Sequence, residues 1–273
     1  MSRRVWIIGP VAVDRVAYID ELPQQGTFVR PLRITERIGG SSGNVALALS
    51  EAGVETGFIS YVGNDKNGAT IKERFTASKI QHLSLQEIVG DSNSALVMVD
   101  SDGERTIVAL TESHLAEISI ADVDFRSDDI VVFSLWRPFF ASHLRHIQDI
   151  GCTTVVGLEA LADPAVHRAD FAIGSEAELG STQISNYLDR FSTIVVTRGA
   201  AGVDQYQGTE QIHVDALNGP VVDTTGAGDS FLAGYLSRLA QGDCNLRSAL
   251  DYGIRWSAAT VAIEGSEPAQ PPL

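Results

Sequence analysis

Short, continuous runs of apolar residues recur along the 273-residue chain. These runs do not alternate apolar with polar positions, which is typical of strands buried on both faces of a parallel sheet. We therefore expect strands at residues 5–8, 57–62, 129–134, 153–157, 169–173 and 192–197.

Segments with helical spacing of apolar residues lie between these runs. Residues 43–52 are rich in Ala and Leu and end before Gly53, a plausible helix stop. Further helices are expected at residues 67–79, 138–150, 226–241 and 246–263. Strands that alternate with helices predict an α/β fold with a mostly parallel, doubly wound sheet.

Two regions, residues 17–38 and 94–110, interrupt the alternation. In the second region, two β-type runs at 95–99 and 105–109 flank a turn sequence. We interpret both regions as a small antiparallel layer that projects from the main sheet, although an extension of the sheet edge fits the pattern equally well. No internal repeat is visible, so we expect one domain over residues 1–273.

The charge balance narrows the range of partners. The chain has 20 Lys and Arg residues against 35 Asp and Glu residues, a formal net charge of −15. Nucleic acids and anionic membranes require basic surfaces, so neither is an expected partner. The apolar run after Arg4 is too short for a signal peptide, and no run has the length of a membrane span. We expect a cytoplasmic protein.

The most informative segment is residues 221–229. Val221 and Val222 suggest a short strand, residues 223–228 (Asp-Thr-Thr-Gly-Ala-Gly) form a turn of small residues, and a helix follows from Asp229. Glycines allow a close approach of the backbone, and a helix N-terminus favours negative charge. This order of elements predicts an anion site formed by backbone amides.

Asp229 stands beside that predicted anion site. A carboxylate is unexpected there if the site only binds anions, but it suits a base that takes the proton of a hydroxyl attacking phosphorus. The alternative is an acidic residue in a helix first turn, favoured by the helix dipole. The order of the whole segment favours the base.

Two common nucleotide-binding motifs are missing from the sequence. It contains no Gly-x-x-x-x-Gly-Lys-Ser/Thr loop, and the first expected strand is not followed by Gly-x-Gly-x-x-Gly. A P-loop enzyme is therefore excluded, and a dinucleotide-dependent oxidoreductase is disfavoured.

Four segments occur in an order that matches a known family. They are residues 39–44 (Gly-Gly-Ser-Ser-Gly-Asn), 63–68 (Gly-Asn-Asp-Lys-Asn-Gly), 197–202 (Thr-Arg-Gly-Ala-Ala-Gly) and 223–229. With these segments the chain resembles the ribokinase-like (PfkB) family of carbohydrate kinases across nearly its whole length. The resemblance implies a three-layer α/β/α domain with a small β lid, formed by about residues 17–38 and 94–110, and ATP as phosphoryl donor.

The resemblance also implies residue roles. Asp229 would be the base, with an anion hole formed by Gly226, Ala227 and Gly228. Substrate hydroxyls would be held by Asp14, Gly39, Gly40 and Asn44, and ATP by Thr197, Gly199 and Gly202. An activating monovalent cation such as K⁺ would bind at Asp223 and Thr225. From the residues alone, Asp14 could equally be a surface carboxylate, Asn44 a helix cap, and the glycine pair a plain turn.

The chain departs from the family pattern at three places. The family's Asn-x-x-Glu appears as Ser175-Glu-Ala-Glu178, in which Glu178 would organise water around Mg²⁺ and Ser175 would contact nucleotide or cap a helix. A family lysine is replaced by serine at Ser41, and a glutamate after the 129–134 strand is replaced by Leu-Trp-Arg. Both latter changes argue against ribose as the substrate.

Trp136 and Arg137 follow the carboxyl end of an expected parallel strand, where such sheets bind ligands. We hypothesise that both line the substrate pocket, the indole by stacking and the guanidinium by pairing with a carboxylate. The alternative is a core Trp and a solvated Arg.

The sequence thus predicts ATP-dependent phosphorylation of a hydroxyl on a sugar or sugar-like molecule. A nucleoside kinase of the same fold is the alternative enzyme. A ligand-binding sensor without turnover is the alternative from another class, and the intact base and anion loop speak against it. A homodimer through the lid is a further expectation, and the substrate itself is not identified.

Overall fold

The main sheet explains the continuous apolar runs. The computed structural model describes residues 2–101, 103–242, 245–265 and 268–272. Within them, nine strands form one sheet in the order β13-β12-β11-β10-β9-β8-β1-β4-β5. Neighbours from β11 to β5 pair in parallel, and β12 and β13 add an antiparallel hairpin at one edge. The strand bounds are β1 (Val5–Ile8), β4 (Thr56–Gly63), β5 (His82–Ile88), β8 (Ile130–Phe133), β9 (Thr153–Val156), β10 (Ala169–Ser175), β11 (Phe191–Thr197), β12 (Val203–Gln207) and β13 (Glu210–Val214).

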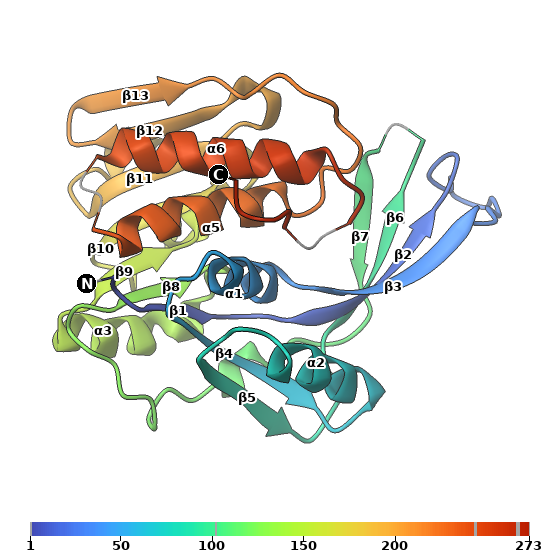
Figure 1. Ribbon diagram of the computed structural model, residues 1–273, viewed down its shortest axis with the longest axis horizontal. Helices are drawn as coiled ribbons and strands as arrows, with labels where there is room; N and C mark the ends of the chain where they lie inside the picture. Colours follow the sequence, from blue (N-terminus) through green and yellow to red (C-terminus); the bar gives the residue numbers. More distant parts are fainter. Residues whose placement is uncertain (1, 102, 243–244, 266–267, 273) are drawn as a thin grey trace.

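Helices cover both faces of this sheet (Figure 1). Residues of α1, α2, α5 and α6 pack in one apolar cluster, and residues of α3 pack in the cluster on the other face. The expected three-layer α/β/α fold is therefore confirmed. The helix bounds are α1 (Ser41–Glu51), α2 (Lys66–Thr76), α3 (Ala141–Ile150), α4 (Glu176–Leu179), α5 (Ala227–Ala240) and α6 (Leu246–Val261).

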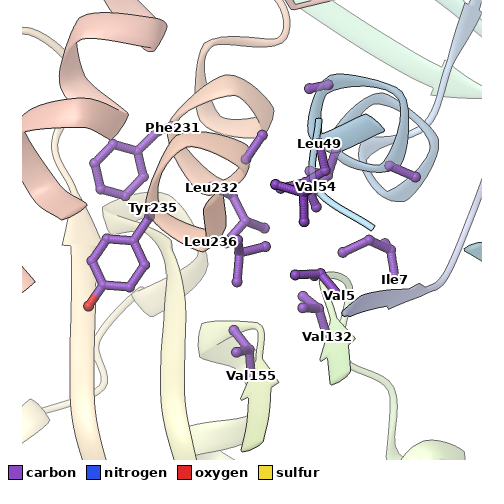
Figure 2. Packing of buried hydrophobic residues seen from close by; sticks show 14 of the residues in the cluster. Val5, Ile7, Leu49, Val54, Val132, Val155, Phe231, Leu232, Tyr235 and Leu236 are labelled. Carbon is purple, nitrogen blue, oxygen red and sulfur yellow. The ribbon is translucent and has the colours of Figure 1, made fainter. Parts of the chain in front are cut away.

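The central strand shows why the apolar runs are unbroken. Val5 and Ile7 of β1 belong to one cluster, whereas Trp6 and Ile8 belong to the other, because successive side chains point to opposite faces of a strand. In Figure 2, Leu232 and Leu236 of α5 point toward the β1 side chains. Full burial of each such residue stabilises the fold by about 1.5–3 kcal/mol.

The position of β1 also locates the crevice where a ligand can bind. This strand pairs with β4 on one side and with β8 on the other. The later strands are therefore added to the sheet on opposite sides of β1. In parallel sheets such a switch point opens a crevice beyond the carboxyl ends of the strands. The loops that follow β1, β8, β10 and β11 all meet that end of the sheet.

A second, smaller sheet projects from this region in Figure 1. Its order is β3-β2-β6-β7, from β2 (Ala12–Tyr18), β3 (Arg33–Gly39), β6 (Ser94–Val99) and β7 (Arg105–Ala109). The two regions expected to form the lid contribute to one sheet, but β2 begins at Ala12, earlier than the expected residue 17. The layer is also not purely antiparallel, because β2 and β6 pair in parallel.

Several local expectations were wrong. Val221 and Val222 form no strand; both side chains are exposed, and the Val222 amide donates to the Val261 carbonyl at 2.7 Å. The strands β5, β12 and β13 were not expected, because they carry many polar residues; β5 and β13 are the edge strands of the sheet. Among the described residues, no helix is long and apolar enough to cross a membrane.

Candidate active site

The N-terminus of α5 meets the N-terminus of α1 at Asp229. Ser41 Oγ donates to Asp229 Oδ1 at 2.7 Å, and Asn44 Nδ2 donates to Asp229 Oδ2 at 2.8 Å. Both donors lie in the first turn of α1. The carboxylate of the predicted base is therefore held in one orientation by two side chains from a distant segment.

The environment of Asp229 makes it a stronger base than an ordinary aspartate. Burial raises the pKa of Asp229, and the hydrogen bonds from Asn44 and Ser41, together with the charge of Arg105, only partly oppose this effect. A carboxylate with a raised pKa accepts a proton more readily, which is what general-base catalysis near neutral pH requires.

The residues predicted to form the anion hole lie at the start of α5. Gly226 precedes the helix with φ of 79°, a left-handed conformation that suits glycine. The amides at the start of a helix have no partner within the helix, so those of Gly226, Ala227 and Gly228 are placed to bind an anion. The Ala227 amide already makes one long contact, 3.4 Å to the Thr224 carbonyl.

The glycine pair before α1 permits close packing against the β1–β2 connection. At Gly40, φ is +84°, and an added Cβ would lie 2.8 Å from Val11 Cα. At Gly39, an added Cβ would lie 2.0 Å from Asp14 Oδ2. Glycine is thus required at Gly40 by its φ and its backbone contacts, whereas a side chain at Gly39 would displace the Asp14 carboxylate.

Asp14 is a buried carboxylate without a fixed partner. Only 8% of the residue is exposed, and within the described part of the chain its carboxylate accepts no hydrogen bond. Burial raises the pKa of Asp14 to about 6; the charge of Arg37 lowers it and that of Asp229 raises it. The Oδ1 atom of Asn44 is likewise buried and, among the described residues, has no partner. Both side chains therefore retain acceptor capacity for ligand hydroxyls.

The expected nucleotide residues lie together at the ends of β10 and β11. Ser175 and Thr197 are partners in the parallel pairing of these strands. The turn after β11 contains Gly199 and Gly202, both with positive φ, and a Cβ at Gly202 would lie 2.1 Å from the Val214 carbonyl oxygen. The Gly199 side of the turn is open, with no atom within 4 Å of an added Cβ.

Ser175 and Glu178 form a capping box at the start of α4. Ser175 Oγ accepts from the Glu178 amide at 3.3 Å, and Glu178 Oε2 accepts from the Ser175 amide at 3.1 Å. The helix-cap alternative for Ser175 is therefore confirmed, and it leaves any nucleotide contact of Ser175 untested.

Glu178 lies near a second carboxylate, Glu159. Burial raises the pKa of Glu178 and hydrogen bonds from Ser175 lower it, whereas the charges of Glu159 and Asp229 raise it further. Glu159 Oε2 is buried and, among the described residues, has no hydrogen-bond partner. Mg²⁺ is commonly held through one or two carboxylates, water and substrate phosphates, so this pair fits a Mg²⁺-nucleotide.

Asp223 was expected to bind a monovalent cation together with Thr225. Its Oδ1 accepts from the Thr225 amide at 2.8 Å, and its Oδ2 accepts from the Gly265 amide at 3.2 Å and contacts Arg37 Nη1 at 3.5 Å. Burial raises the pKa of Asp223, but these hydrogen bonds and the charge of Arg37 outweigh burial and lower it overall. Both carboxylate oxygens thus have partners in the fold, whereas the buried Oγ1 of Thr225 has no hydrogen-bond partner among the described residues.

The pocket role expected for Trp136 is wrong. The indole is 2% exposed, packs against Phe133 and Phe140, and donates to Asp163 Oδ2 at 2.8 Å. The alternative of a core Trp is correct, because the chain turns after β8 and buries this side chain in the α3-side cluster. The Arg137 side chain is 45% exposed, with Nη1 3.6 Å from Glu159 Oε1.

Sequence reasoning missed four residues of this region. Ser41 contacts Asp229, and Ser42 Oγ lies 2.6 Å from Ser134 Oγ, which links α1 to the end of β8. Arg37 contacts Asp223, and Glu159 accompanies Glu178. Ser41 and Ser42 were noticed only as replacements for a lysine, and no local signal singled out Arg37 or Glu159.

Two other depressions lie at the amino ends of the strands. One, of about 420 Å³, is lined by residues such as Cys152 and Arg190; the other, of about 640 Å³, includes Trp6 and His82. Neither includes a residue predicted for the site. The chemistry-bearing residues gather instead at the carboxyl ends of the strands, under the lid.

The chain is similar to known proteins over nearly its whole length. The model of the family described as pfkB family carbohydrate kinase matches residues 2–271. A ribokinase of Staphylococcus aureus is 25% identical, with 100% of this chain and 98% of that protein covered. A nucleoside kinase of Methanothermobacter thermautotrophicus is 27% identical, covering 97% and 92%. The structure of Arabidopsis thaliana ribokinase complexed with ribose and ATP superposes with a TM-score of 0.78 at 19% identity, covering 97% and 95%.

Proposed function

Because the chain belongs to the PfkB family of ATP-dependent carbohydrate kinases, we propose that it transfers the γ-phosphoryl group of ATP to a hydroxyl of a sugar or sugar-like molecule. The observation that carries this proposal is the Asp229 carboxylate, oriented by Ser41 and Asn44 beside the amides of the α5 N-terminus. A base next to an anion hole is the arrangement that phosphoryl transfer to a hydroxyl requires.

The proposed step is a direct transfer. The acceptor hydroxyl gives its proton to Asp229 as its oxygen forms a bond to the γ-phosphorus, and the bond from that phosphorus to the ADP oxygen breaks. The amides of Gly226, Ala227 and Gly228 stabilise the negative charge on the phosphoryl oxygens during transfer. Asp14 and Asn44 orient the acceptor through other hydroxyls.

The nucleotide would lie across the ends of β10 and β11, over Thr197, Gly199 and Gly202. Bound Mg²⁺ would neutralise phosphate charge, and Glu178 and Glu159 would hold it, directly or through water. The buried, unpartnered Oε2 of Glu159 and the charge of Glu159, which raises the pKa of Glu178, are consistent with a site that awaits a positive charge.

A nucleoside kinase is the second candidate. On the lid face that carries Asp14, Val16 and Val97 pack in a small apolar cluster and are 0% and 1% exposed, so these two side chains offer no open surface to a nucleobase. The likeness to an archaeal nucleoside kinase supports this candidate in the same measure as the likeness to ribokinase supports the first.

The test is a panel of sugars and nucleosides with Mg²⁺-ATP and detection of ADP. Asp229→Asn should lower kcat by about 10²-fold or more with substrate binding retained, because the amide cannot accept the proton. Asp251→Asn, at an exposed carboxylate of α6, is the matched control. Turnover restricted to nucleosides would reject the sugar reading, and an unchanged rate in Asp229→Asn would reject the mechanism.

We also propose that the outer face of the lid contacts a second copy of the chain. Ile34 and Val108 are 62% and 45% exposed, and strand pairing places both on the face opposite Asp14. Light scattering after size-exclusion chromatography should show a dimer, and Ile34→Lys with Val108→Lys should shift it to monomer. A monomer from the unchanged chain would contradict this proposal.

A further inference from the structure

Arg37 reaches from the lid into the anion loop. It lies on β3 directly opposite Asp14 of β2 and therefore on the same face of the lid. Its Nη1 atom lies 3.5 Å from Asp223 Oδ2, and the two side chains are only 13% and 4% exposed. Asp223 begins the loop that ends at the catalytic base, so a lid residue forms a buried ion pair with the catalytic segment.

Asp223 needs a positive charge, and Arg37 is positioned to supply it. Burying a carboxylate without a counter-charge is strongly unfavourable. The other partners of Asp223 are the neutral amides of Thr225 and Gly265. Asp223 and Thr225 were also the positions at which a monovalent cation was expected, yet the carboxylate already has three protein partners.

The remaining atoms of the Arg37 guanidinium are not used by another acidic group. Its Nε and Nη2 atoms are buried and, among the described residues, have no hydrogen-bond partner. The charge of Arg37 lowers the pKa of Asp14, but among the described residues no hydrogen bond joins the two side chains. One cation therefore serves two buried carboxylates of the site, and its direct contact is with Asp223.

We propose that Arg37 is a built-in replacement for a monovalent cation: it holds Asp223, and through it the 224–228 loop, in the geometry that forms the anion hole. This inference rests on the proposed function. It assigns Arg37 as a positioning residue, since it acts on the reacting phosphoryl group through the loop. It also makes the enzyme independent of K⁺.

The ion pair further couples the lid to the catalytic segment. Arg33, also on β3, forms an ion pair with Glu264, one residue before the Gly265 amide that donates to Asp223. Two arginines of one lid strand thus form ion pairs with neighbouring segments: Arg37 with Asp223, and Arg33 with Glu264. These ion pairs stabilise the position of β3 and the conformation of the 224–228 loop together.

The first experiment measures the unchanged protein in K⁺ and in tetramethylammonium at equal ionic strength. We expect the same Tm and a kcat that differs by less than about 2-fold, because the charge beside Asp223 is part of the chain. A clear rise of kcat and Tm in K⁺ alone would show that a metal ion still binds there and would overturn the inference.

The second experiment compares Arg37→Ala with Arg37→Lys. We expect Arg37→Ala to lower kcat by about 10²-fold, as misplacement of a catalytic loop does, and to lower Tm by about 5–10 °C. Methylguanidinium should recover part of both values, and Arg37→Lys should retain most of both because it keeps the charge. Arg15→Ala, at an exposed lid arginine, is the matched control.

Equal activity and Tm of Arg37→Ala and the unchanged protein would also overturn the inference. If Arg37→Ala does not fold, the K⁺ comparison on the unchanged protein still decides the question. The Tm readout separates this inference from the proposed function. If no sugar or nucleoside in the panel led to ADP formation that depends on Asp229, the proposed function would be rejected. A Tm that rises only in K⁺ would reject only the role of Arg37.

Discussion

Asn44 and Asp229 are 185 residues apart in the sequence, yet the Asn44 amide donates a 2.8 Å hydrogen bond to the Asp229 carboxylate. Asn44 lies in the first turn of α1 and Asp229 in the first turn of α5. Two helix N-termini therefore converge on one carboxylate. Their combined dipoles favour negative charge at the place where a phosphoryl group would be transferred.

Ser41→Ala should leave the Asp229 carboxylate in place but less firmly oriented. The variant loses the 2.7 Å hydrogen bond to Asp229 Oδ1, and hydrogen bonds to charged groups are worth about 1.5–3 kcal/mol. We expect kcat/KM to fall by about 10- to 100-fold in steady-state assays. Ser50→Ala is the matched control, because Ser50 Oγ donates to the Leu47 carbonyl of the same helix, away from Asp229. An equal loss in both variants would point to a general defect of α1.

The pH profile should reveal the state of Asp229. Burial raises its pKa, and only the ionised form acts as a base. We expect kcat/KM to fall as the pH drops, with an acid limb above the ordinary aspartate value of 3.8. Ser41→Ala should move this limb to higher pH, since the lost hydrogen bond favoured the ionised form. A limb that stays in place in Ser41→Ala would belong to another group.

Asp14→Asn should stabilise the fold while it impairs substrate binding. Burial raises the pKa of Asp14 from 3.8 to about 6, so the folded state binds the proton more tightly than the unfolded state. The free energy of unfolding therefore falls as the pH rises between these two pKa values. Above them, the ionised Asp14 carboxylate lowers the free energy of unfolding by its full amount, about 3 kcal/mol. Urea unfolding should show Asp14→Asn as more stable than the unchanged protein at about pH 8, with KM raised.

The difference in stability should narrow as the pH falls through the range between the two pKa values. Asp20→Asn, at an exposed residue just beyond β2, should show no such pH-dependent gain. Equal stability of Asp14→Asn and the unchanged protein at high pH would mean that Asp14 is compensated by a charge in the fold.

Gly40→Ala should disrupt the approach of α1 to the site. Gly40 has φ of +84°, and an added Cβ would lie 2.8 Å from Val11 Cα and 2.9 Å from the Pro10 carbonyl oxygen. Gly53 has φ of +75° but no atom within 4 Å of an added Cβ, so Gly53→Ala measures the conformational cost alone. Gly53→Ala should lower the free energy of unfolding by about 1–2 kcal/mol. In urea unfolding, Gly40→Ala should lower it by about 1–3 kcal/mol more than Gly53→Ala does.

Because Ser41 and Asn44 follow Gly40, Gly40→Ala should also lower kcat, whereas Gly53→Ala should leave it near the unchanged value. If the two substitutions had equal effects on stability and rate, the close contact at Val11 would have no role in positioning α1.

The fold and the turn-and-helix start around Asp229 were predictable because their signals are local. Continuous apolar runs mark strands buried on both faces, as the split of Val5 and Trp6 between the two clusters shows. The turn at Gly226 requires glycine for its own φ, and the helix that starts after it follows from its apolar pattern. Each of these features depends on a few neighbouring residues, so the sequence by itself determined them.

The partners within the site depended on the tertiary structure. Trp136 follows a strand, and an apolar side chain there can face the crevice or the core; only the packing of Phe133 and Phe140 shows that it faces the core. The contacts of Asp229 with Asn44 and of Asp223 with Arg37 join segments far apart in the chain. Such pairs are decided by which faces of separate elements meet, and no local pattern of residues contains that information.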